Sequence, residues 1–303
     1  MEVIDAALTA TLLPYPALTQ ALYDMLLTKR VGRATAPQRT VLSIDDGGSL
    51  LLMPATSSEL MIVKLVTVHP QNDVHDLPRV QATLLVLDAR TGRRLYLLDG
   101  ETATARRTAA LSLLAAKRLV PTCNGILLII GAGIQARAHL EAFAQGFDLQ
   151  EAYIASRTLA SAQRLASQAQ QLGVVAHVTS SPSEVLRDAT LIVTATTSVE
   201  PVVTNDVHPD AFVAAVGAYR PDMAELPAEL VRRSTLYVDT LEGAQAEAGD
   251  LLRAGVNWAN VTPLEQIIDQ PPSVRRGPII FKSVGHALWD LAAAEVVHRS
   301  RTR

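Results

Sequence analysis

A glycine-rich motif follows the apolar run at residues 126–130 and precedes a helical pattern that begins at Arg137. In the motif G-x-G-x-x-G/A, the first glycine allows a tight strand-to-helix turn and the second lets the backbone approach a pyrophosphate. The small third residue, here Ala136, lets the helix pack closely on the strand, and the helix N-terminus offers free N–H groups to phosphates. The motif therefore predicts a dinucleotide site rather than a plain turn. The expected contacts are Gly131, Gly133, Ile134 and Gln135.

The end of the next strand, expected at residues 152–155, bears on which dinucleotide binds. An NAD site usually carries an aspartate or glutamate at this point, which binds the ribose 2′-hydroxyl. This chain has Ser156, Arg157 and Thr158 instead. Arg157 can pair with a 2′-phosphate and stack on the adenine. It can also be read as a solvated residue at a helix start, but the missing acid and the added cation both favour NADP(H).

Two cations lie in otherwise apolar segments. Lys64 interrupts a buried-type strand pattern at residues 60–66, and Arg107 shares a helix face with alanine and leucine side chains. Burying an unpaired charge is costly, so such residues are normally exposed, paired or functional. Lys64 either faces water from an edge strand or receives an anionic substrate. For Arg107 the pattern favours a snorkelling residue over a carboxylate clamp, and Arg39, in a loop, is a weaker candidate.

The elements that must position these residues fall into two parts. The first part is a helix and a mainly antiparallel sheet, followed by another helix. From residue 125 strands and helices alternate, which implies an α/β fold with a parallel, doubly wound sheet. The expected strands are 40–44, 49–53, 61–68, 80–87, 94–98, 126–130, 152–155, 174–178, 191–195, 212–216 and 236–238, and the expected helices include 16–28, 102–119, one starting at the capping box Ser181–Glu184, and 286–298.

Composition limits the possible functions. The chain has 303 residues, of which 49% are hydrophobic and 19% charged, with a formal net charge of -3, so nucleic-acid and membrane partners are not expected. The single cysteine, Cys123, excludes an internal disulfide framework, and the N-terminus lacks a signal peptide's basic start, so a cytoplasmic location is expected. The seven histidines show no metal-ligand spacing, and no nucleophile elbow or P-loop is present.

Several segments together resemble the ornithine cyclodeaminase/mu-crystallin family. They are VKLVTVHPQN, LLDGETATARRTAALSLLAA, IIGAGIQARAHLEA, VTATTS, GAYRPDMAEL, EAGDLL and FKSVGHALWD, which span nearly the whole chain in order. The resemblance implies a homodimer with a substrate-binding and dimerisation domain at residues 1–119, completed by 286–303, and an NADP-binding Rossmann domain at 120–285. It also implies that Arg39, Lys64 and Arg107 hold a substrate carboxylate, that Gln81 lines the substrate pocket, and that Thr194, Ala195, Thr196, Ser283, Val284 and Gly285 line the cofactor.

The chain departs from the cyclodeaminases at one position. Their motif carries an aspartate that handles the substrate's side-chain amine, and Tyr219 matches it here, followed by Arg220-Pro221-Asp222. This resembles the mu-crystallin-like ketimine reductase branch, although Asp222 and Glu225 lie nearby. The resemblance implies NADPH-dependent reduction of 1-pyrroline-2-carboxylate or 1-piperideine-2-carboxylate to L-proline or L-pipecolate. The alternatives are an alanine dehydrogenase-like or ornithine cyclodeaminase activity, or a non-catalytic NADPH-dependent ligand-binding protein.

Overall fold

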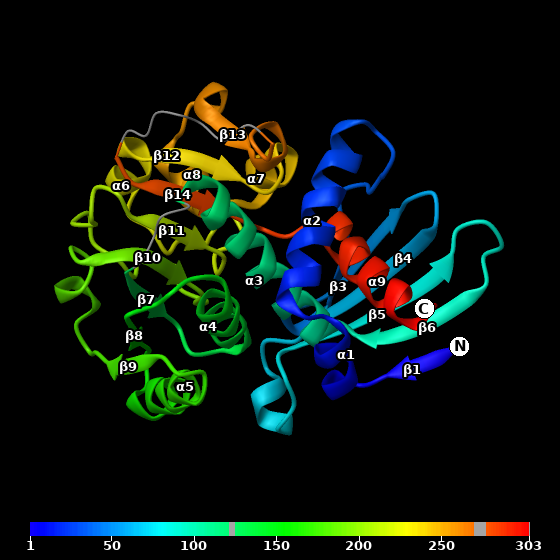
Figure 1. Ribbon diagram of the computed structural model, residues 1–303, viewed down its shortest axis with the longest axis horizontal. Helices are drawn as coiled ribbons and strands as arrows, with labels where there is room; N and C mark the ends of the chain where they lie inside the picture. Colours follow the sequence, from blue (N-terminus) through cyan, green and yellow to red (C-terminus); the bar gives the residue numbers. More distant parts are fainter. Residues whose placement is uncertain (121–124, 270–276, 303) are drawn as a thin grey trace. The chain divides into compact units, whose positions relative to one another are not determined.

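The computed structural model describes residues 1–120, 125–269 and 277–302, and it divides into two compact units (Figure 1). Unit 1 comprises Met1–Arg107 and His286–Arg303, and unit 2 comprises Thr108–Gly285. The division falls inside the helix α3 (Gly100–Leu119), whereas the sequence places the boundary at the end of that helix. Cys123 and most of the expected loop at 270–278 lie outside the described residues.

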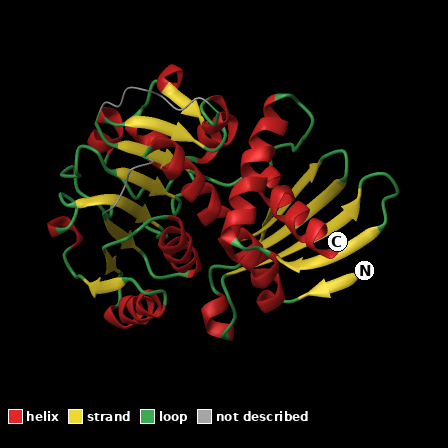
Figure 2. Cartoon of the chain, viewed as in Figure 1, coloured by secondary structure: helices red, strands yellow, loops and turns green. Residues whose placement is uncertain are grey.

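Unit 1 is built on a six-stranded sheet with the order β1-β6-β5-β4-β3-β2. The strands pair antiparallel except β1, which pairs parallel with β6. The helix α9 packs against β3 and β4, and α2 packs on α9, so helices cover one face of the sheet (Figure 2). The elements are β1 (Glu2–Ile4), α1 (Ala6–Leu12), α2 (Tyr15–Arg30), β2 (Thr40–Ile44), β3 (Gly48–Thr56), β4 (Leu60–Val68), β5 (Val80–Asp88), β6 (Arg94–Asp99) and α9 (Ala287–Arg301).

Strand register explains which side chains this sheet buries. Met53, Lys64, Leu84 and Leu98 are successive partners across β3, β4, β5 and β6, and all four are buried. Because side chains alternate along a strand, this row belongs to one face of the sheet. Lys64 is therefore a buried residue of a central strand, and the edge-strand interpretation is wrong.

Unit 2 is built on an eight-stranded, entirely parallel sheet with the order β13-β12-β14-β11-β10-β7-β8-β9. The expected α/β class with a doubly wound sheet is confirmed. The elements are β7 (Ile126–Ile130), α4 (Ile134–Gly146), β8 (Glu151–Ala155), α5 (Leu159–Gln171), β9 (Val175–Val178), β10 (Ala189–Thr194), β11 (Phe212–Ala215), α6 (Ala228–Arg233), β12 (Thr235–Val238), α7 (Leu241–Glu247), α8 (Gly249–Ala254), β13 (Val261–Pro263) and β14 (Ile279–Lys282).

The strand order reverses next to the glycine-rich motif. From β7 the chain adds β8 and then β9 on one side, and it returns to place β10 and then β11 on the other side. In open α/β sheets ligands bind outside the carboxyl ends of the strands at such a reversal. The end of β7, where the motif begins, is therefore at the topological position of a ligand site.

Several short elements differ from the sequence expectation. The strands β1 and β13 have three residues each and β14 has four, which is too short for a periodic pattern. The capping box at Ser181 starts only a 3-10 helix, Pro182–Glu184, without a side-chain cap bond. Only residues 185–188 separate it from β10, so the predicted longer helix has no room. Among the described residues, no helix is both long and apolar enough to cross a membrane.

Candidate active site

The glycine-rich motif forms a cradle that side chains would fill. Gly131 has a φ of 121°, and a Cβ there would lie 2.4 Å from the carbonyl oxygen of Ala195. Both observations require glycine at this position. Gly133 is the N-cap of α4 and is exposed, a Cβ on it would meet open space, and no side chain caps the helix. The N–H groups of the first turn, at Ile134 and Gln135, are therefore free of a capping side chain, as a bound phosphate requires.

The residues after β8 extend this cradle. Ser156 is half-buried, whereas Arg157 and Thr158 are exposed, and Thr158 is the N-cap of α5 without capping it through its side chain. This three-residue segment presents a guanidinium and two hydroxyls and no carboxylate. The carboxylate that usually binds the ribose 2′-hydroxyl in an NAD site is thus absent from this segment.

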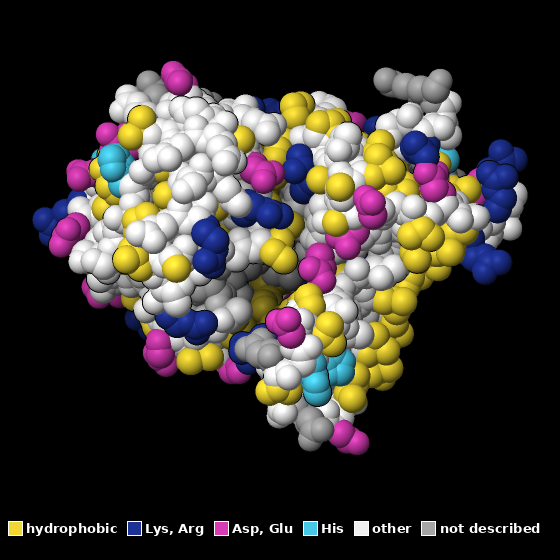
Figure 3. Space-filling model, turned by 90° about the horizontal axis from the view of Figure 1, so that it is seen from below, with side chains coloured by type: hydrophobic (Ala, Val, Ile, Leu, Met, Phe, Trp, Pro, Cys, Tyr) yellow, Lys and Arg dark blue, Asp and Glu magenta, His cyan; other side chains and the backbone are white. Residues whose placement is uncertain are grey.

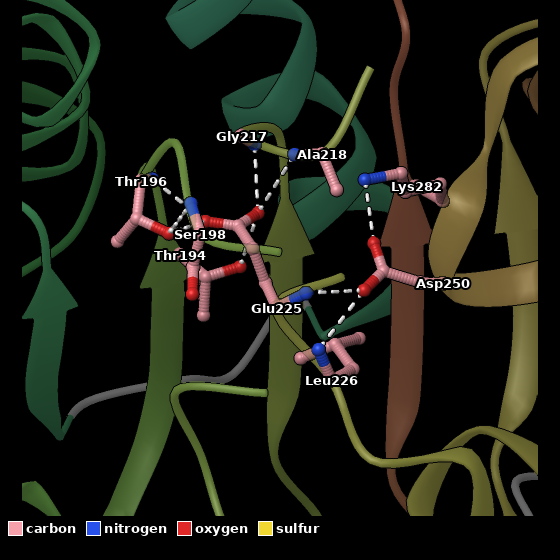
Figure 4. Close-up of polar contacts among 9 residues, drawn as sticks. All are labelled: Thr194, Thr196, Ser198, Gly217, Ala218, Glu225, Leu226, Asp250 and Lys282. Carbon is pink, nitrogen blue, oxygen red and sulfur yellow. Dashed lines mark hydrogen bonds and ion pairs between the residues drawn. The ribbon is translucent and has the colours of Figure 1, made fainter. Parts of the chain in front are cut away.

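Two carboxylates of unit 2 hold the other segments predicted to line the cofactor. Asp239, fully buried, accepts from Ser283 Oγ at 2.8 Å and from the backbone N–H of Gly285 at 2.9 Å, which fixes the segment Ser283–Gly285. Val284, between them, is buried. Glu225 binds the segment that contains Thr194 and Thr196 (Figure 4). The structure thus provides specific anchors for two of the predicted cofactor segments.

In unit 1 the two apolar-segment cations meet on one carboxylate. Lys64 Nζ lies 2.7 Å from Asp290 Oδ2, and Arg107 Nε donates to Asp290 Oδ1 at 2.9 Å. Lys64 Nζ also donates to Thr104 Oγ1 at 3.3 Å. Both cations are 3% exposed and Asp290 is fully buried. The snorkelling interpretation of Arg107 is therefore wrong, because its charged end is buried and paired.

Local structure explains how these groups come together. The helix α3 begins where Asp99 Oδ1 accepts from the N–H of Thr102, and two turns later the same helix carries Arg107. The helix α9 begins at its N-cap His286, whose Nδ1 accepts from the N–H of Leu288. One turn into α9, Asp290 is placed over the central strand β4, against which this helix packs.

The charges in this cluster do not balance. Burial lowers the pKa of Lys64 to about 8; Asp290 opposes this shift, whereas Arg107 and Arg39 add to it. Burial alone would raise the pKa of Asp290, but Arg107 and Lys64 hold it below its usual value. Three cations thus influence a site with one carboxylate. Arg107 Nη1 is buried and has no hydrogen-bond partner in the described part of the chain, so the cluster suits a further anion.

The structure brings together Lys64, Arg107 and Arg39 but does not add Gln81 to them. Gln81 is exposed near the start of β5, and its register partner is Thr67. Thr67 and Lys64 are three residues apart on β4, so Gln81 and Lys64 are on opposite faces of the sheet. Its assignment to the substrate pocket remains a prediction from the resemblance.

Asp290 is the functional residue that sequence reasoning missed. It lies within the segment FKSVGHALWD and on a helix whose residues 287–294 are all buried. A carboxylate in so apolar a helix is the same signal that singled out Lys64 and Arg107. The three residues together would have indicated a buried ionic cluster, because such charges must be paired.

Two further groups show what other chemistry the fold contains. Among the described residues, no group of three or more histidine, cysteine or acidic side chains could hold a metal ion. His139 on α4 is fully buried between Gln135 O, at 2.8 Å, and Ser112 Oγ, at 2.9 Å. Burial lowers its pKa to about 4, so it is neutral at pH 7 and joins α4 to α3.

The family model for the ornithine cyclodeaminase/mu-crystallin family matches residues 7–302. The chain belongs to this family. It is 39% identical to "Delta(1)-pyrroline-2-carboxylate reductase 1" of Burkholderia multivorans, over 96% of this chain and 93% of that one. It is also 39% identical to "Ketimine reductase mu-crystallin" of Mus musculus, over 89% of this chain and 86% of that one.

A solved structure supports the same placement. The chain superposes with a TM-score of 0.93 and 29% identity on the Delta(1)-pyrroline-2-carboxylate reductase of Thermococcus litoralis, which was solved in complex with NADH and L-proline. The superposition covers 100% of this chain and 98% of that one. The expected mu-crystallin-like branch and the Rossmann-type fold are confirmed, and the protein is an oxidoreductase of this family.

Proposed function

We propose that the protein reduces cyclic ketimine carboxylates, namely 1-pyrroline-2-carboxylate or 1-piperideine-2-carboxylate, to L-proline or L-pipecolate with NADPH. The observation that carries the proposal is the buried cluster of Lys64, Arg107 and Asp290. It holds more positive than negative charge and includes a guanidinium donor that no described residue satisfies. A planar guanidinium matches a carboxylate in two parallel hydrogen bonds.

In this proposal the protein's own residues hold and orient the substrate. Arg107 binds the carboxylate through Nη1 while its Nε stays on Asp290, so the guanidinium is fixed before the substrate arrives. Arg39, whose charge acts on Lys64, adds to the binding of the anion. Fixing the carboxylate places the adjacent imine carbon in one position, which lowers the entropic part of the barrier.

Reduction adds a hydride to the imine carbon and leaves a proton on nitrogen. NADPH, when bound, supplies the hydride. A protonated imine is already electrophilic, so the protein needs no strong additional acid. Lys64, with a pKa of about 8, holds its proton at pH 7 and is suited either to orient the carboxylate or to assist protonation of the imine.

The preference for NADPH over NADH is part of the proposal. Support comes from the segment after β8, where Ser156, Arg157 and Thr158 offer a cation and no carboxylate. The Thermococcus litoralis enzyme was solved with NADH. The nucleotide therefore has to be assigned to this chain by its own residues at this position.

A homodimer is proposed from the second face of the unit 1 sheet. The face opposite to Lys64 carries apolar side chains on all six strands of the sheet, and several are well exposed, including Leu42 at 49% and Leu65 at 41%. Figure 3 shows a continuous run of hydrophobic side chains on this unit. Monomeric proteins rarely leave so large an apolar surface in water. A second copy, presenting the same face, is the occupant we propose. The residues of this face are Val3, Leu42, Leu50, Leu52, Pro54, Val63, Leu65, Leu85 and Leu97.

Ornithine cyclodeamination is disfavoured by the carboxylates near Tyr219. Asp222 is exposed and paired with Arg220, whose Nη2 lies 2.8 Å from Asp222 Oδ2. Both oxygens of Glu225 are occupied by donors of its own unit. Neither carboxylate is thus free to handle a substrate ammonium in place of the missing aspartate.

The test measures the rate of NADPH oxidation with each of several candidate substrates. We expect turnover with 1-pyrroline-2-carboxylate or 1-piperideine-2-carboxylate, and little with pyruvate plus ammonium. With L-ornithine and a catalytic amount of NAD, ammonia release should be much slower than ketimine reduction. Faster turnover of pyruvate with ammonium would make the enzyme an amino-acid dehydrogenase. Nucleotide binding without any turnover would favour a ligand-binding protein.

A further inference from the structure

One buried carboxylate of unit 2 gathers an unusually large number of donors (Figure 4). Glu225 Oε1 accepts from the backbone N–H of Thr196 at 2.7 Å and from its hydroxyl at 2.9 Å. Glu225 Oε2 accepts from the N–H groups of Gly217 at 2.7 Å and Ala218 at 3.2 Å, and from Thr194 Oγ1 at 3.0 Å. The side chain is fully buried. Burial raises the pKa of Glu225, whereas the five donors around its two oxygens favour the ionised carboxylate.

The backbone of Glu225 is itself held by a second buried carboxylate, Asp250. Asp250 Oδ1 accepts from the backbone N–H groups of Glu225 at 2.6 Å and Leu226 at 2.9 Å. Its other oxygen forms an ion pair with Lys282 Nζ at 2.7 Å, and both residues are completely buried. Lys282 ends β14, which lies beside β11 in the sheet. The network therefore spans the carboxyl ends of β10, β11 and β14.

The packing around Glu225 leaves no space for a side chain at Gly217. A Cβ on Gly217 would lie 2.3 Å from Glu225 Oε1 and 2.2 Å from the carbonyl oxygen of Thr196. Glycine is therefore required for the carboxylate to approach both loops at once. The loop after β10 also lies against the glycine-rich motif, because the carbonyl oxygen of Ala195 is the atom that a Cβ on Gly131 would strike.

These loops lie on one side of the reversal in strand order. The glycine-rich motif and Ser156–Thr158 follow β7 and β8, on the adenosine side of a Rossmann sheet. The loops that Glu225 holds follow β10 and β11, on the other side of the reversal, where the second mononucleotide half binds. All of the donors to Glu225 thus belong to β10 and to the loops after β10 and β11, on the second side of the reversal.

We propose that Glu225 is a positioning residue for the nicotinamide half of the nucleotide site. Its carboxylate fixes the backbone of both loops, at Thr196 and at Gly217–Ala218, in the arrangement that receives the nicotinamide nucleotide. The inference rests on the proposed function, because it presumes that a nicotinamide dinucleotide binds across the reversal. It predicts that loss of the carboxylate affects the two halves of the ligand differently.

The experiment measures nucleotide binding by calorimetry, without substrate. Glu225→Gln keeps the shape of the side chain. Its NH2 group replaces one carboxylate oxygen and therefore faces backbone N–H donors, either that of Thr196 or those of Gly217 and Ala218. We expect the Kd for NADPH to rise about tenfold or more, in line with the loss of charge-assisted hydrogen bonds. The Kd for 2′,5′-ADP, which carries only the adenosine half, should not change. NADH and 5′-AMP provide the same comparison for the other nucleotide.

Controls separate positioning from general destabilisation. Asp222→Asn removes an exposed carboxylate three residues away and should leave both Kd values unchanged. If Glu225→Gln does not fold, Thr194→Val removes one donor to Glu225 without a change of size and should weaken NADPH about threefold with 2′,5′-ADP unchanged. A parallel loss of both ligands, or no loss of either, overturns the inference. If the unmodified protein binds neither dinucleotide, the proposed function itself fails.

Discussion

The amine nitrogen of Lys64 and the carboxylate of Asp290 lie 2.7 Å apart, although 226 residues separate them in the sequence. Both side chains are buried, with exposed fractions of 3% for Lys64 and 0% for Asp290. Asp290 also binds Arg107, so one carboxylate neutralises part of two cations. The remaining positive charge suits the binding of a further anion.

Removing either cation should impair turnover and leave the fold intact. In Lys64→Met or Arg107→Leu the other cation still neutralises Asp290, so both variants should fold and bind NADPH. Loss of one charge-assisted contact to the substrate should lower kcat/KM by about ten- to a hundredfold. Steady-state kinetics and circular dichroism measure the two effects. Lys117→Met, which removes an exposed lysine of α3, is the matched control. Normal ketimine turnover in either variant would remove that residue from the site.

Removing the shared carboxylate should have the opposite result. Asp290→Asn leaves Lys64 and Arg107 buried without their counter-ion, and breaking a buried pair in this way costs about 3–5 kcal/mol of unfolding free energy. We expect a clear fall in Tm as the main effect of this substitution. Asp222→Asn, at an exposed ion pair, should leave Tm nearly unchanged. An Asp290→Asn protein as stable as the unmodified one would show that the cations have another partner.

The pH dependence of kcat/KM should report Lys64. Because burial lowers the pKa of Lys64 to about 8, the amine is fully protonated well below pH 8 and loses its charge as the pH rises through that value. We therefore expect kcat/KM to fall above about pH 8. Lys64→Arg keeps the charge, since a guanidinium stays protonated to about pH 12, and it should abolish this fall. The same alkaline fall in both proteins would assign the titration to the substrate imine.

Nucleotide choice should depend on Arg157. A charge-assisted contact with the 2′-phosphate contributes about 1.5–3 kcal/mol, so NADPH should bind about one to two decades more tightly than NADH. Arg157→Asp should weaken NADPH and relatively favour NADH. Arg164→Asp, at an arginine of the following helix α5 that is also exposed, is the control for a general change in surface charge. Equal kinetic constants with both nucleotides in the unmodified enzyme would contradict the assignment.

The oligomeric state should depend on the apolar face of the unit 1 sheet. Leu65 projects from the centre of that face and is 41% exposed. Leu65→Glu places a charge there and should convert a dimer into a monomer, as measured by light scattering after gel filtration. Leu172→Glu, at a similarly exposed leucine after α5, should not change the mass. A monomeric unmodified protein would refute the proposed dimer.

The sequence predicts one site far better than the other. The motif at Gly131 lies within a few residues of the strand and helix that give it meaning, so local pattern is sufficient to identify it. Lys64 and Arg107 were ambiguous because periodicity shows which residues share a face but not whether a strand is central. Resolving that question required the sheet order, which depends on pairings between distant segments.

Residues that act through long-range contacts were missed for the same reason. The Arg107–Asp290 bond spans 183 residues, and no local pattern indicates such a pairing. The sequence shows Glu225 only as a carboxylate near Tyr219, where it could handle a substrate amine. Its real contacts are backbone N–H groups of neighbouring loops, which no side-chain pattern reveals.

The composition of unit 1 has a consequence for how the protein is made. Its residues come from the two ends of the chain, with the whole of unit 2 between them. Synthesis proceeds from the N-terminus, so Lys64 and Arg107 are made long before Asp290, which follows Arg107 by 183 residues. Until α9 leaves the ribosome, these two cations lack the carboxylate that makes their burial favourable. Unit 2 can complete its sheet first, and unit 1 closes only after α9 has been made.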